Sequence, residues 1–370
     1  DLRELRKRLL GLINMKKGRV SNMTAADSLI GLVNPQPYST IMIYDVHASE
    51  SGALAILDDL YKQIRAYADK SVKWVFIVST PHYEETKEIT VRRFPWVKKN
   101  WGYRYYFDTI TTRKLLNEFK PDKVFSLQNK GIDFYNKEQL VYLHLPFILT
   151  DHKFSMKVDG KKLWAYQNII NKSIFRSLRK VNMTIVQTQW MKDALVKKAG
   201  VNADKIVIQQ PDIKCNDIKR FEDCPENRRR IFYPATSFTY KNHRTLLKAL
   251  DYAQRKGLKD YEVIFTIHPD ENECTWQLQE FAEKNGLNVK FNGPIPREKV
   301  FEMYKKSILV FPSYVESFGF PLLEAKLTGT YIIASDTPFC REILNGYDKV
   351  KFFEEMDYKK LGDLILEVIK

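Results

Sequence analysis

The apolar positions of this chain fall into short runs that alternate with segments of helical period. In the first half, the pattern predicts strands at residues 40–46, 72–80, 122–128, 140–149, 183–188 and 205–210, and helices at 53–67, 112–119, 163–179 and 189–198. In the second half, it predicts strands at 230–236, 261–268, 288–293, 307–311 and 330–335, and helices at 243–256, 275–285, 298–305, from 321 and from 357. This alternation is typical of two doubly wound α/β domains, which bind ligands beyond the carboxyl ends of their strands.

The predicted domain limits follow the segments where this period is lost. Residues 209–227 show no apolar period and are expected to hold the linker. We therefore expect a basic leader over 1–38, a first Rossmann-like domain over 39–210 and a second over 211–370, with a terminal helix at 357–370.

The charge of the chain is divided unevenly between these halves. Residues 1–210 contain 35 Lys and Arg against 20 Asp and Glu, whereas residues 211–370 contain 25 of each. The formal charge of +15 therefore belongs to the first half, which favours an anionic partner on that domain.

Several patterns that define other protein classes are missing from the sequence. No apolar run approaches the roughly 18 residues that span a bilayer. The four cysteines have no metal-ligand spacing and are expected to be reduced thiols in the cytosol. The G-x-G-x-x-G fingerprint is also absent, which argues against an ordinary dinucleotide oxidoreductase.

The segment SYVESFGFPLLEA, residues 313–325, carries the most informative chemistry. It places Glu316 and Glu324 eight positions apart, on a loop that follows a buried strand and opens into a helix at Pro321. No good capping residue precedes Pro321, so the first helical N–H groups form a potential anion site. Spacing alone leaves a second interpretation open, in which Glu316 is a solvated acid and Glu324 favours the helix dipole.

This segment, within GPIPREKVFEMYKKSILVFPSYVESFGFPLLEAKLTGTYIIASDTPFCREI, resembles the second domain of retaining GT-B glycosyltransferases with the Glu-x7-Glu signature. The stretch YPATSFTYKNHRTLLKAL resembles the phosphate-binding segment of the same family. The resemblance is strong over about residues 230–345 and rests on element order alone over 40–210. It implies a nucleotide-sugar in the cleft between two domains.

The resemblance implies a role for each residue of the Glu-x7-Glu segment. Glu316 would bind the donor sugar hydroxyls and stabilise positive charge at the anomeric carbon, and Glu324 would accept from the ribose hydroxyls. Four backbone N–H groups would meet sugar and phosphate oxygens, those of Ser317, Phe318, Gly319 and Phe320.

Lys241 would neutralise the diphosphate leaving group, which would allow transfer without a metal ion. Otherwise it is a solvated loop lysine. Many relatives carry an arginine six residues earlier, where this chain has Ala235. Either Arg244 or a residue of the first domain replaces that cation, or the leaving group is held differently.

Three further residues match family positions less closely. Gly52 stands where the family keeps a glycine-rich loop against the donor phosphate, although it could instead permit a tight turn. His144 matches a histidine that faces the donor sugar, although a lone histidine in an apolar run is often a core residue. Pro296 lies where backbone groups recognise the donor base. The sequence does not identify the base or the sugar of the donor. It contains no Cys/His cluster and no Asp-x-Asp pair, so we expect no metal ion and no cofactor.

Three basic segments of the first half point to a membrane-facing acceptor domain. The leader forms a basic amphipathic pattern that includes Arg6 and Lys7, and residues 153–180 form another basic run. The third segment, 92–107, mixes cations with aromatic rings, as the headgroup zone of a bilayer favours. Its residues assigned to a membrane or acceptor surface are Arg92, Arg93, Trp96, Lys98, Lys99 and Trp101. Each segment alone could be a solvated face, and the leader could dock on its own protein.

The expected function is transfer of a sugar to a glycan acceptor, lipid-linked by our interpretation, during assembly of a surface polysaccharide or lipopolysaccharide. The enzyme would lie in the cytoplasm, at the inner face of the membrane. Two alternatives stay open: a GT-B enzyme acting on protein or nucleic acid, and a non-enzymatic module binding nucleic acid. Basic and aromatic residues also suit single strands, but no nucleic-acid motif is present.

Overall fold

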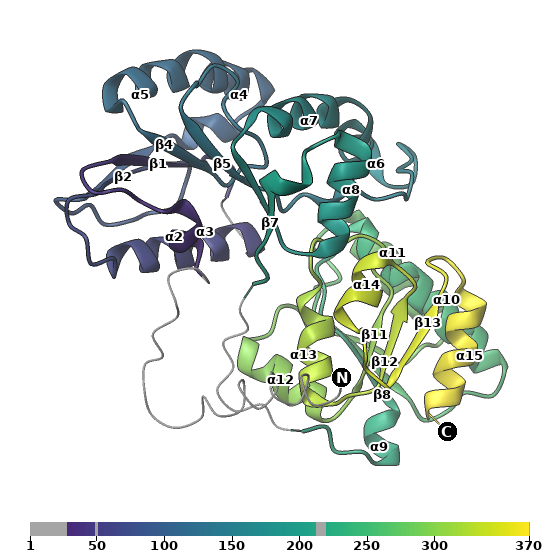
Figure 1. The fold of residues 1–370 in the computed structure, drawn as a ribbon. Coiled ribbons are helices and arrows are strands. Elements are labelled where there is room, and N and C mark those ends of the chain that lie inside the picture. The colour runs from purple at the N-terminus through teal and green to yellow at the C-terminus, as the bar shows by residue number, and fades with distance from the viewer. Residues whose placement is uncertain (1–27, 49–50, 212–219, 370) are drawn as a thin grey trace. The chain divides into compact units, whose positions relative to one another are not determined.

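The computed structural model describes residues 28–48, 51–211 and 220–369 (Figure 1). All its strand pairs are parallel where their register is defined, and they form two sheets. The first sheet has the order β3-β2-β1-β4-β5-β6-β7 and the second the order β10-β9-β8-β11-β12-β13. These sheets confirm the predicted α/β class.

The elements of the first half have the following bounds. The strands are β1 Thr40–Asp45, β2 Lys73–Val78, β3 Ile89–Arg93, β4 Lys123–Ser126, β5 Glu138–Tyr142, β6 Met183–Val186 and β7 Ile206–Ile208. The α-helices are α2 Leu29–Val33, α3 Ser51–Arg65, α4 Trp101–Tyr106, α5 Thr112–Phe119, α6 Gly160–Ala165, α7 Asn171–Lys180 and α8 Gln189–Ala199.

The second half repeats the same kind of succession. Its strands are β8 Arg230–Tyr233, β9 Glu262–Phe265, β10 Val289–Phe291, β11 Ile308–Phe311, β12 Ile332–Ser335 and β13 Val350–Phe353. Its α-helices are α9 Pro225–Arg228, α10 His243–Arg255, α11 Glu273–Lys284, α12 Arg297–Lys305, α13 Phe320–Thr328, α14 Pro338–Ile343 and α15 Tyr358–Ile369.

By its contacts the chain divides into two compact units. Unit 1 comprises the residues up to Gln128 together with Asn136–Leu140, and unit 2 comprises Asn129–Tyr135 together with the residues from Val141. The domain limits expected from the sequence stay predictions.

The central strands are buried along nearly their whole length because helices cover both faces of each sheet. All four residues of β11 and of β12 are buried, and five of the six residues of β1 are buried. In the second sheet, α12 and α13 lie against one face and α10 and α15 against the other (Figure 1). The strand order reverses between β8 and β11, so ligands are expected where these two strands end.

Three departures from the predicted elements have physical causes. The predicted helix 163–179 is two α-helices joined by a π-turn, η5 Tyr166–Ile170, and α4 precedes α5 through a second π-turn, η3 Phe107–Thr111. A π-turn inserts one residue and shifts the apolar period. The predicted strand 140–149 ends at Tyr142, since Pro146 starts a 3₁₀ turn. Edge strand β3 was missed because its residues are only partly buried.

Helices α10 and α15 approach each other closely at Gly362. A Cβ atom built on this glycine would lie 2.7 Å from Tyr252 Cδ1 and 2.8 Å from the carbonyl oxygen of Ala249. The glycine therefore sets the separation of these two helices.

We expect Gly362→Ala to lower the free energy of unfolding by about 1–3 kcal/mol, because the added methyl group overpacks this contact. Chemical denaturation measures the change. The matched control is Gly52→Ala in α3, where nothing lies within 4 Å of the added Cβ. Equal stability of the two variants would contradict the packing argument.

Candidate functional site

A lysine and a glutamate meet where β8 and β11 end. Lys241 closes the 3₁₀ turn η7 Thr239–Lys241 in the loop after β8, and Glu316 lies in the loop after β11. Lys241 Nζ is 2.5 Å from Glu316 Oε1, and Ser313 Oγ donates to the same oxygen at 2.8 Å. The two side chains are only 17% and 14% exposed. The structure thus brings together two residues that are 75 positions apart in the sequence.

His243, two residues after Lys241, is buried among aromatic rings and is uncharged. Tyr233 Oη donates to the carbonyl oxygen of Lys241 at 2.7 Å. The ring of His243 lies 4.8 Å from that of Tyr233 and 4.9 Å from that of Phe265. Burial, reinforced by the positive charge of Lys241, lowers the pKa of His243 to about 3. His243 is therefore neutral at physiological pH, and the positive charge at this strand end belongs to Lys241.

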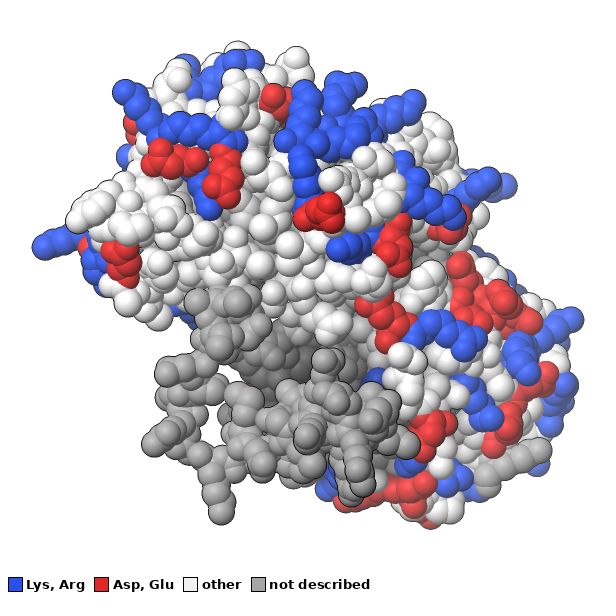
Figure 2. Space-filling view, viewed as in Figure 1, with Lys and Arg blue, Asp and Glu red and all other residues white. Residues whose placement is uncertain are grey.

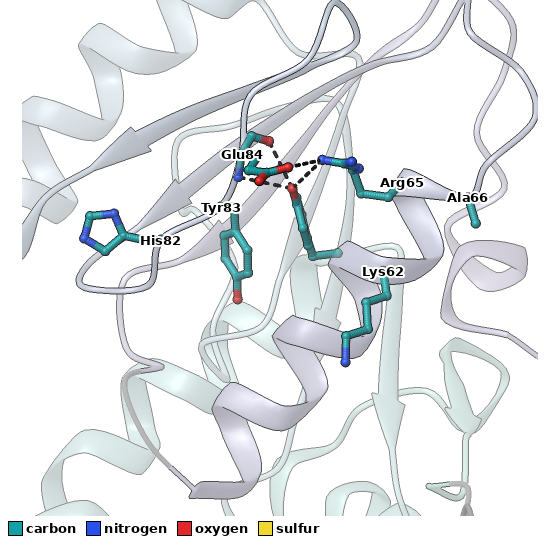
Figure 3. A pocket seen from close by; sticks show the side chains of 7 residues that line it. Lys62, Arg65, Ala66, His82, Tyr83 and Glu84 are labelled. Carbon is teal, nitrogen blue, oxygen red and sulfur yellow. Dashed lines mark hydrogen bonds and ion pairs between the residues drawn. The ribbon is translucent and has the colours of Figure 1, made fainter.

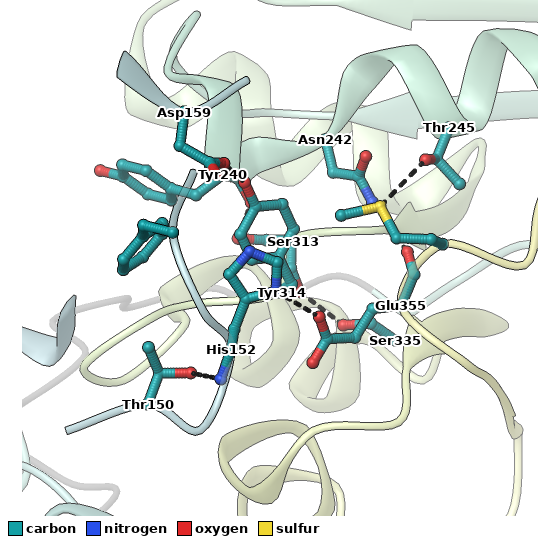
Figure 4. A network of polar contacts seen from close by, with 12 residues as sticks. Thr150, His152, Asp159, Tyr240, Asn242, Thr245, Ser313, Tyr314, Ser335 and Glu355 are labelled. Carbon is teal, nitrogen blue, oxygen red and sulfur yellow. Dashed lines mark hydrogen bonds and ion pairs between the residues drawn. The ribbon is translucent and has the colours of Figure 1, made fainter. Parts of the chain in front are cut away.

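Asn242 joins three segments of the site. It adopts a left-handed backbone conformation, with φ of 61°, between Lys241 and helix α10. Its Nδ2 donates to the carbonyl oxygens of Pro312, at 3.1 Å, and Glu355, at 2.9 Å. Figure 4 shows Asn242 between the strand ends and the turn that carries Glu355. This residue therefore fixes the loop of Lys241 against the loop of Glu316.

A polar and aromatic network packs against the Glu316 loop within unit 2 (Figure 4). Tyr314 Oη donates to Asp159 Oδ1 at 2.7 Å, and the ring centroid of His152 lies 4.3 Å from that of Tyr314. His152 Nδ1 is in turn 3.1 Å from Glu355 Oε2. These contacts hold the backbone two residues before Glu316 from several directions.

The start of helix α13 has the features of an anion site. Gly319, its N-cap residue, has φ of 91° and provides no side-chain cap, and Pro321 stands in the first turn. Phe318 is buried, and its ring lies 5.3 Å from that of Phe320. Ser317 is partly exposed, and its carbonyl oxygen accepts from Thr188 Oγ1 at 3.0 Å. A nine-residue helix without a side-chain cap has N–H groups and a dipole that favour negative charge.

Glu324 lies one turn into this helix and is almost fully buried. Its side chain is 6% exposed, Oε1 is 2.9 Å from Arg297 Nη2, and Oε2 accepts from Tyr304 Oη at 3.3 Å. Burial raises the pKa of Glu324, and the positive charge of Arg297 opposes that shift. In the described structure, the carboxylate predicted to bind ribose is thus paired with an arginine.

The remaining candidates of the second half lie in different settings. Pro296, exposed, is the N-cap residue of α12 and directly precedes Arg297. At the position of the missing arginine, the N–H of Ala235 donates to Thr266 Oγ1 at 3.1 Å. Arg244 is exposed in the first turn of α10.

His144 and Gly52 come from the first half of the chain. The N–H of His144 donates to Asn129 Oδ1 at 2.8 Å, and its Nε2 is 3.4 Å from Asn129 Nδ2. Gly52 is the second residue of helix α3 and has open space around its Cα. The helical position of Gly52 removes the interpretation that it permits a tight turn with positive φ.

The residues assigned to a membrane or acceptor surface lie in unit 1 wherever the structure describes them. Trp101 is 70% exposed, whereas Trp96 is partly buried. Lys98 and Lys99 are exposed. Arg92 lies near Glu85 and Glu118, and Arg93 donates to the carbonyl oxygen of Thr80. Arg6 and Lys7 lie outside the described residues.

A hollow of about 610 Å³ also lies in unit 1, against the end of α3 (Figure 3). Its polar groups largely satisfy one another: Arg65 Nη1 is 2.9 Å from Glu84 Oε2, and Tyr61 Oη donates to the carbonyl oxygen of Glu84. Both charged side chains of the pair are more than 40% exposed. This solvated pair gives the hollow no evident chemistry.

The described residues contain neither a metal-binding group nor a membrane-spanning helix. No group of three or more His, Cys, Asp or Glu within those residues could hold a metal ion. Over the same part of the chain, no helix is both long enough and apolar enough to cross a membrane.

Sequence reasoning found Lys241, Glu316 and Glu324 but missed Asn242, Tyr314 and Arg297 as their partners. A left-handed residue between a strand-end loop and a helix is often Asn, so Asn242 carried a weak signal. For Tyr314 and Arg297, no local pattern exists, since their partners are distant in sequence.

Two family models match this chain. Residues 216–370 match the family of glycosyl transferases group 1, and residues 60–211 match glycosyltransferase family 4. Together the two matches cover most of the chain, which therefore belongs to the group 1, family 4 glycosyltransferases and is an enzyme of that class.

Two curated relatives share 24% identity with this chain. They are O-antigen chain mannosyltransferase B of Escherichia coli, over 47% of this chain, and O-antigen chain mannosyltransferase RfbU of Salmonella typhimurium, over 58%. The matched regions span only 49% and 60% of the lengths of these relatives.

Solved structures share the fold over most of their length. WaaG, a glycosyltransferase involved in lipopolysaccharide biosynthesis, has a TM-score of 0.62 and 16% identity, covering 89% of this chain and 90% of its own. Anabaena Alr3699/HepE in complex with UDP and glucose has a TM-score of 0.60 and 15% identity, covering 90% of both chains. At these identities the likeness shows the GT-B fold alone.

Two substitutions of Asn242 test how its side chain and its left-handed backbone contribute to the stability of the two loops at the site. Asn242→Gly keeps the left-handed backbone but removes both side-chain hydrogen bonds, so we expect a loss of about 1–3 kcal/mol in the free energy of unfolding. Asn242→Ala removes the same bonds and adds roughly 1–2 kcal/mol of left-handed strain. Denaturant titration of both variants measures the two contributions, and equal losses would contradict a role for the backbone conformation.

Proposed function

We propose that this enzyme transfers a sugar from a nucleotide-sugar to a glycan acceptor with retention of anomeric configuration and without a metal ion. The observation that carries the proposal is the shielded Lys241–Glu316 pair beside the start of helix α13. It joins a cation suited to a departing diphosphate with a carboxylate suited to sugar hydroxyls, where the strand order reverses.

In the proposed mechanism, the donor diphosphate binds at the start of α13 and beside Lys241. The backbone N–H groups of residues 317–320 and the lysine stabilise negative charge as the bond from the anomeric carbon to the diphosphate breaks. Glu316 accepts from donor sugar hydroxyls and stabilises the positive charge that develops at the anomeric carbon. These groups supply the charge stabilisation that a divalent cation provides in other phosphate chemistry.

Glu324 is proposed to accept hydrogen bonds from the two ribose hydroxyls. Its contact with Arg297 must then open or be shared, because Oε1 pairs with that arginine in the described structure. Arg297 is 50% exposed and lies at the start of α12, so it has room to turn toward the donor phosphates. We include it among the cations that could replace the family's missing arginine.

The acceptor is proposed to be a glycan, carried on a lipid, in the synthesis of O-antigen, lipopolysaccharide or a related surface polysaccharide. The printed names of the two curated relatives and of WaaG support this choice. The exposed cations and aromatic rings of residues 92–107 support an acceptor domain at an anionic membrane surface. The proposed location is the cytoplasmic face of the cell membrane.

The donor class is the first point to test. The HepE complexes make UDP-glucose the first candidate, followed by GDP-, dTDP- and ADP-sugars. We expect one donor, with EDTA present, to raise the melting temperature on the order of 2–5 °C at about 100 times its dissociation constant. A thermal-shift screen of the full chain measures this, and no response to any nucleotide-sugar would contradict the proposal.

Lys241 and Glu316 are expected to be essential for turnover. Lys241→Ala and Glu316→Ala should each lower kcat by about 10²–10³-fold, because each removes a group that stabilises transition-state charge. Lys259→Ala and Glu280→Ala, at exposed positions of unit 2, are matched controls that should retain the wild-type rate. Initial rates with the identified donor, alongside circular dichroism, give the comparison; near wild-type turnover in either site variant would refute the assignment.

A further inference from the structure

An apolar hollow of about 490 Å³ opens in unit 1. It is lined by five residues of the turn η2 Pro95–Lys98 and of helix α4 with its N-cap residue: Trp96, Asn100, Gly102, Tyr103 and Tyr106. It is a shallow hollow, largely open to solvent.

The rings that line the hollow are held by one another and by the helix start. The ring of Trp96 lies 5.9 Å from that of Tyr103, 6.2 Å from that of Tyr106 and 5.9 Å from that of the buried Phe107. Asn100 caps α4, since its Oδ1 accepts from the N–H of Tyr103 at 3.1 Å. The hollow is therefore formed by the local fold of residues 95–107.

Large side chains are exposed along α4 and the π-turn η3 that follows it. Trp101 is 70% exposed, Tyr105 73%, Tyr103 45%, Tyr106 46% and Ile110 44%. A soluble domain rarely exposes so many large side chains on one short segment unless they meet a partner. Aromatic rings with polar tips are favoured at the border between water and hydrocarbon.

The surroundings of the hollow are strongly basic. Residues 92–114 contain seven Lys and Arg and one acid, Asp108, which pairs with Arg104 at 2.9 Å. Lys99 Nζ lies 5.8 Å from the ring centroid of Tyr103, which lines the hollow. Figure 2 shows Lys and Arg side chains over α5 of unit 1, and others over α7 of unit 2. An occupant should therefore combine an apolar body with a negative charge.

We propose that this hollow, defined by Trp96, Asn100, Gly102, Tyr103 and Tyr106, binds the hydrocarbon chain of a lipid phosphate whose phosphate meets the basic rim beside Lys99. The inference rests on the proposed function, since the lipid phosphate would be the carrier of the glycan acceptor. It adds a specific site for the hydrocarbon chain of the lipid to the general attraction between basic residues and an anionic membrane surface.

The lining favours a hydrocarbon chain over a nucleic-acid base or a sugar ring. Besides the tyrosine hydroxyls and the indole N–H of Trp96, the polar lining side chain is Asn100, and its oxygen is already engaged in capping α4. Base edges and sugar hydroxyls would bury polar groups with few partners there, at a cost in free energy. A hydrocarbon chain needs no such partners.

Decyl phosphate, below its micelle concentration, is a suitable probe for calorimetric titration of the full chain without donor. We expect it to bind, and to bind at least tenfold more tightly than decanol or inorganic phosphate. Gly102→Leu should weaken binding at least tenfold, because its side chain would extend into the hollow. Lys99→Glu should weaken binding of decyl phosphate but not of decanol.

Trp276→Ala is the matched control, since Trp276 is 56% exposed on helix α11 of unit 2; it should bind decyl phosphate as the wild type does. Tyr103→Ser, at a half-exposed position, serves as a second variant if Gly102→Leu does not fold. Unchanged binding in the folded hollow variant would overturn the proposal. Tighter binding of oligo(dT) than of decyl phosphate, lost in that variant, would also overturn it in favour of a nucleic-acid site.

The titration separates this inference from the proposed function. Loss of lipid-phosphate binding with intact response to a nucleotide-sugar refutes the chain-binding site alone. Lipid-phosphate binding without response to any nucleotide-sugar refutes the proposed donor chemistry and leaves the chain-binding site supported.

Discussion

The candidate site depends on one ion pair, between Lys241 and Glu316, formed where the strand order of the second sheet reverses. Its two side chains are mostly shielded from water, so each charge would be costly to bury without the other. The pair also links two loops that leave adjacent parallel strands. Because β8 and β11 are neighbours, residues 75 positions apart in sequence meet without any special turn between them.

The loops around this pair are held by contacts that leave the charged groups facing the site. Asn242 ties the lysine loop to Pro312 and Glu355, and Ser313 supports the carboxylate of Glu316 directly. Preorganised charges of this kind stabilise a transition state without reorganising during the reaction. These hydrogen bonds hold the loops in place, and on the proposed function the ion pair and the start of α13 carry the chemistry.

Sequence predicted the α/β class and the residues whose signal is local. Glu316, Glu324 and the helix start at Pro321 fall within 13 consecutive residues, 313–325, so their spacing can be recognised directly. Asn242 could not be understood in this way, because its acceptors are 70 and 113 positions away. The pairing of Arg297 with Glu324 is likewise tertiary, and the π-turns after α4 and α6 disrupt the apolar period by which helices are recognised.

In the described structure each glutamate of the Glu-x7-Glu signature forms an ion pair. Glu316 pairs with Lys241, and Glu324 pairs with Arg297. A donor diphosphate brings negative charge, so on the proposed function it competes with these carboxylates for the same two cations. Each carboxylate would then lose part of its ion pair and gain hydroxyl donors from the sugar or the ribose. The exchange conserves the number of partners at each buried carboxylate, which limits the desolvation cost of binding. A nucleotide lacking its sugar could not make that exchange at Glu316.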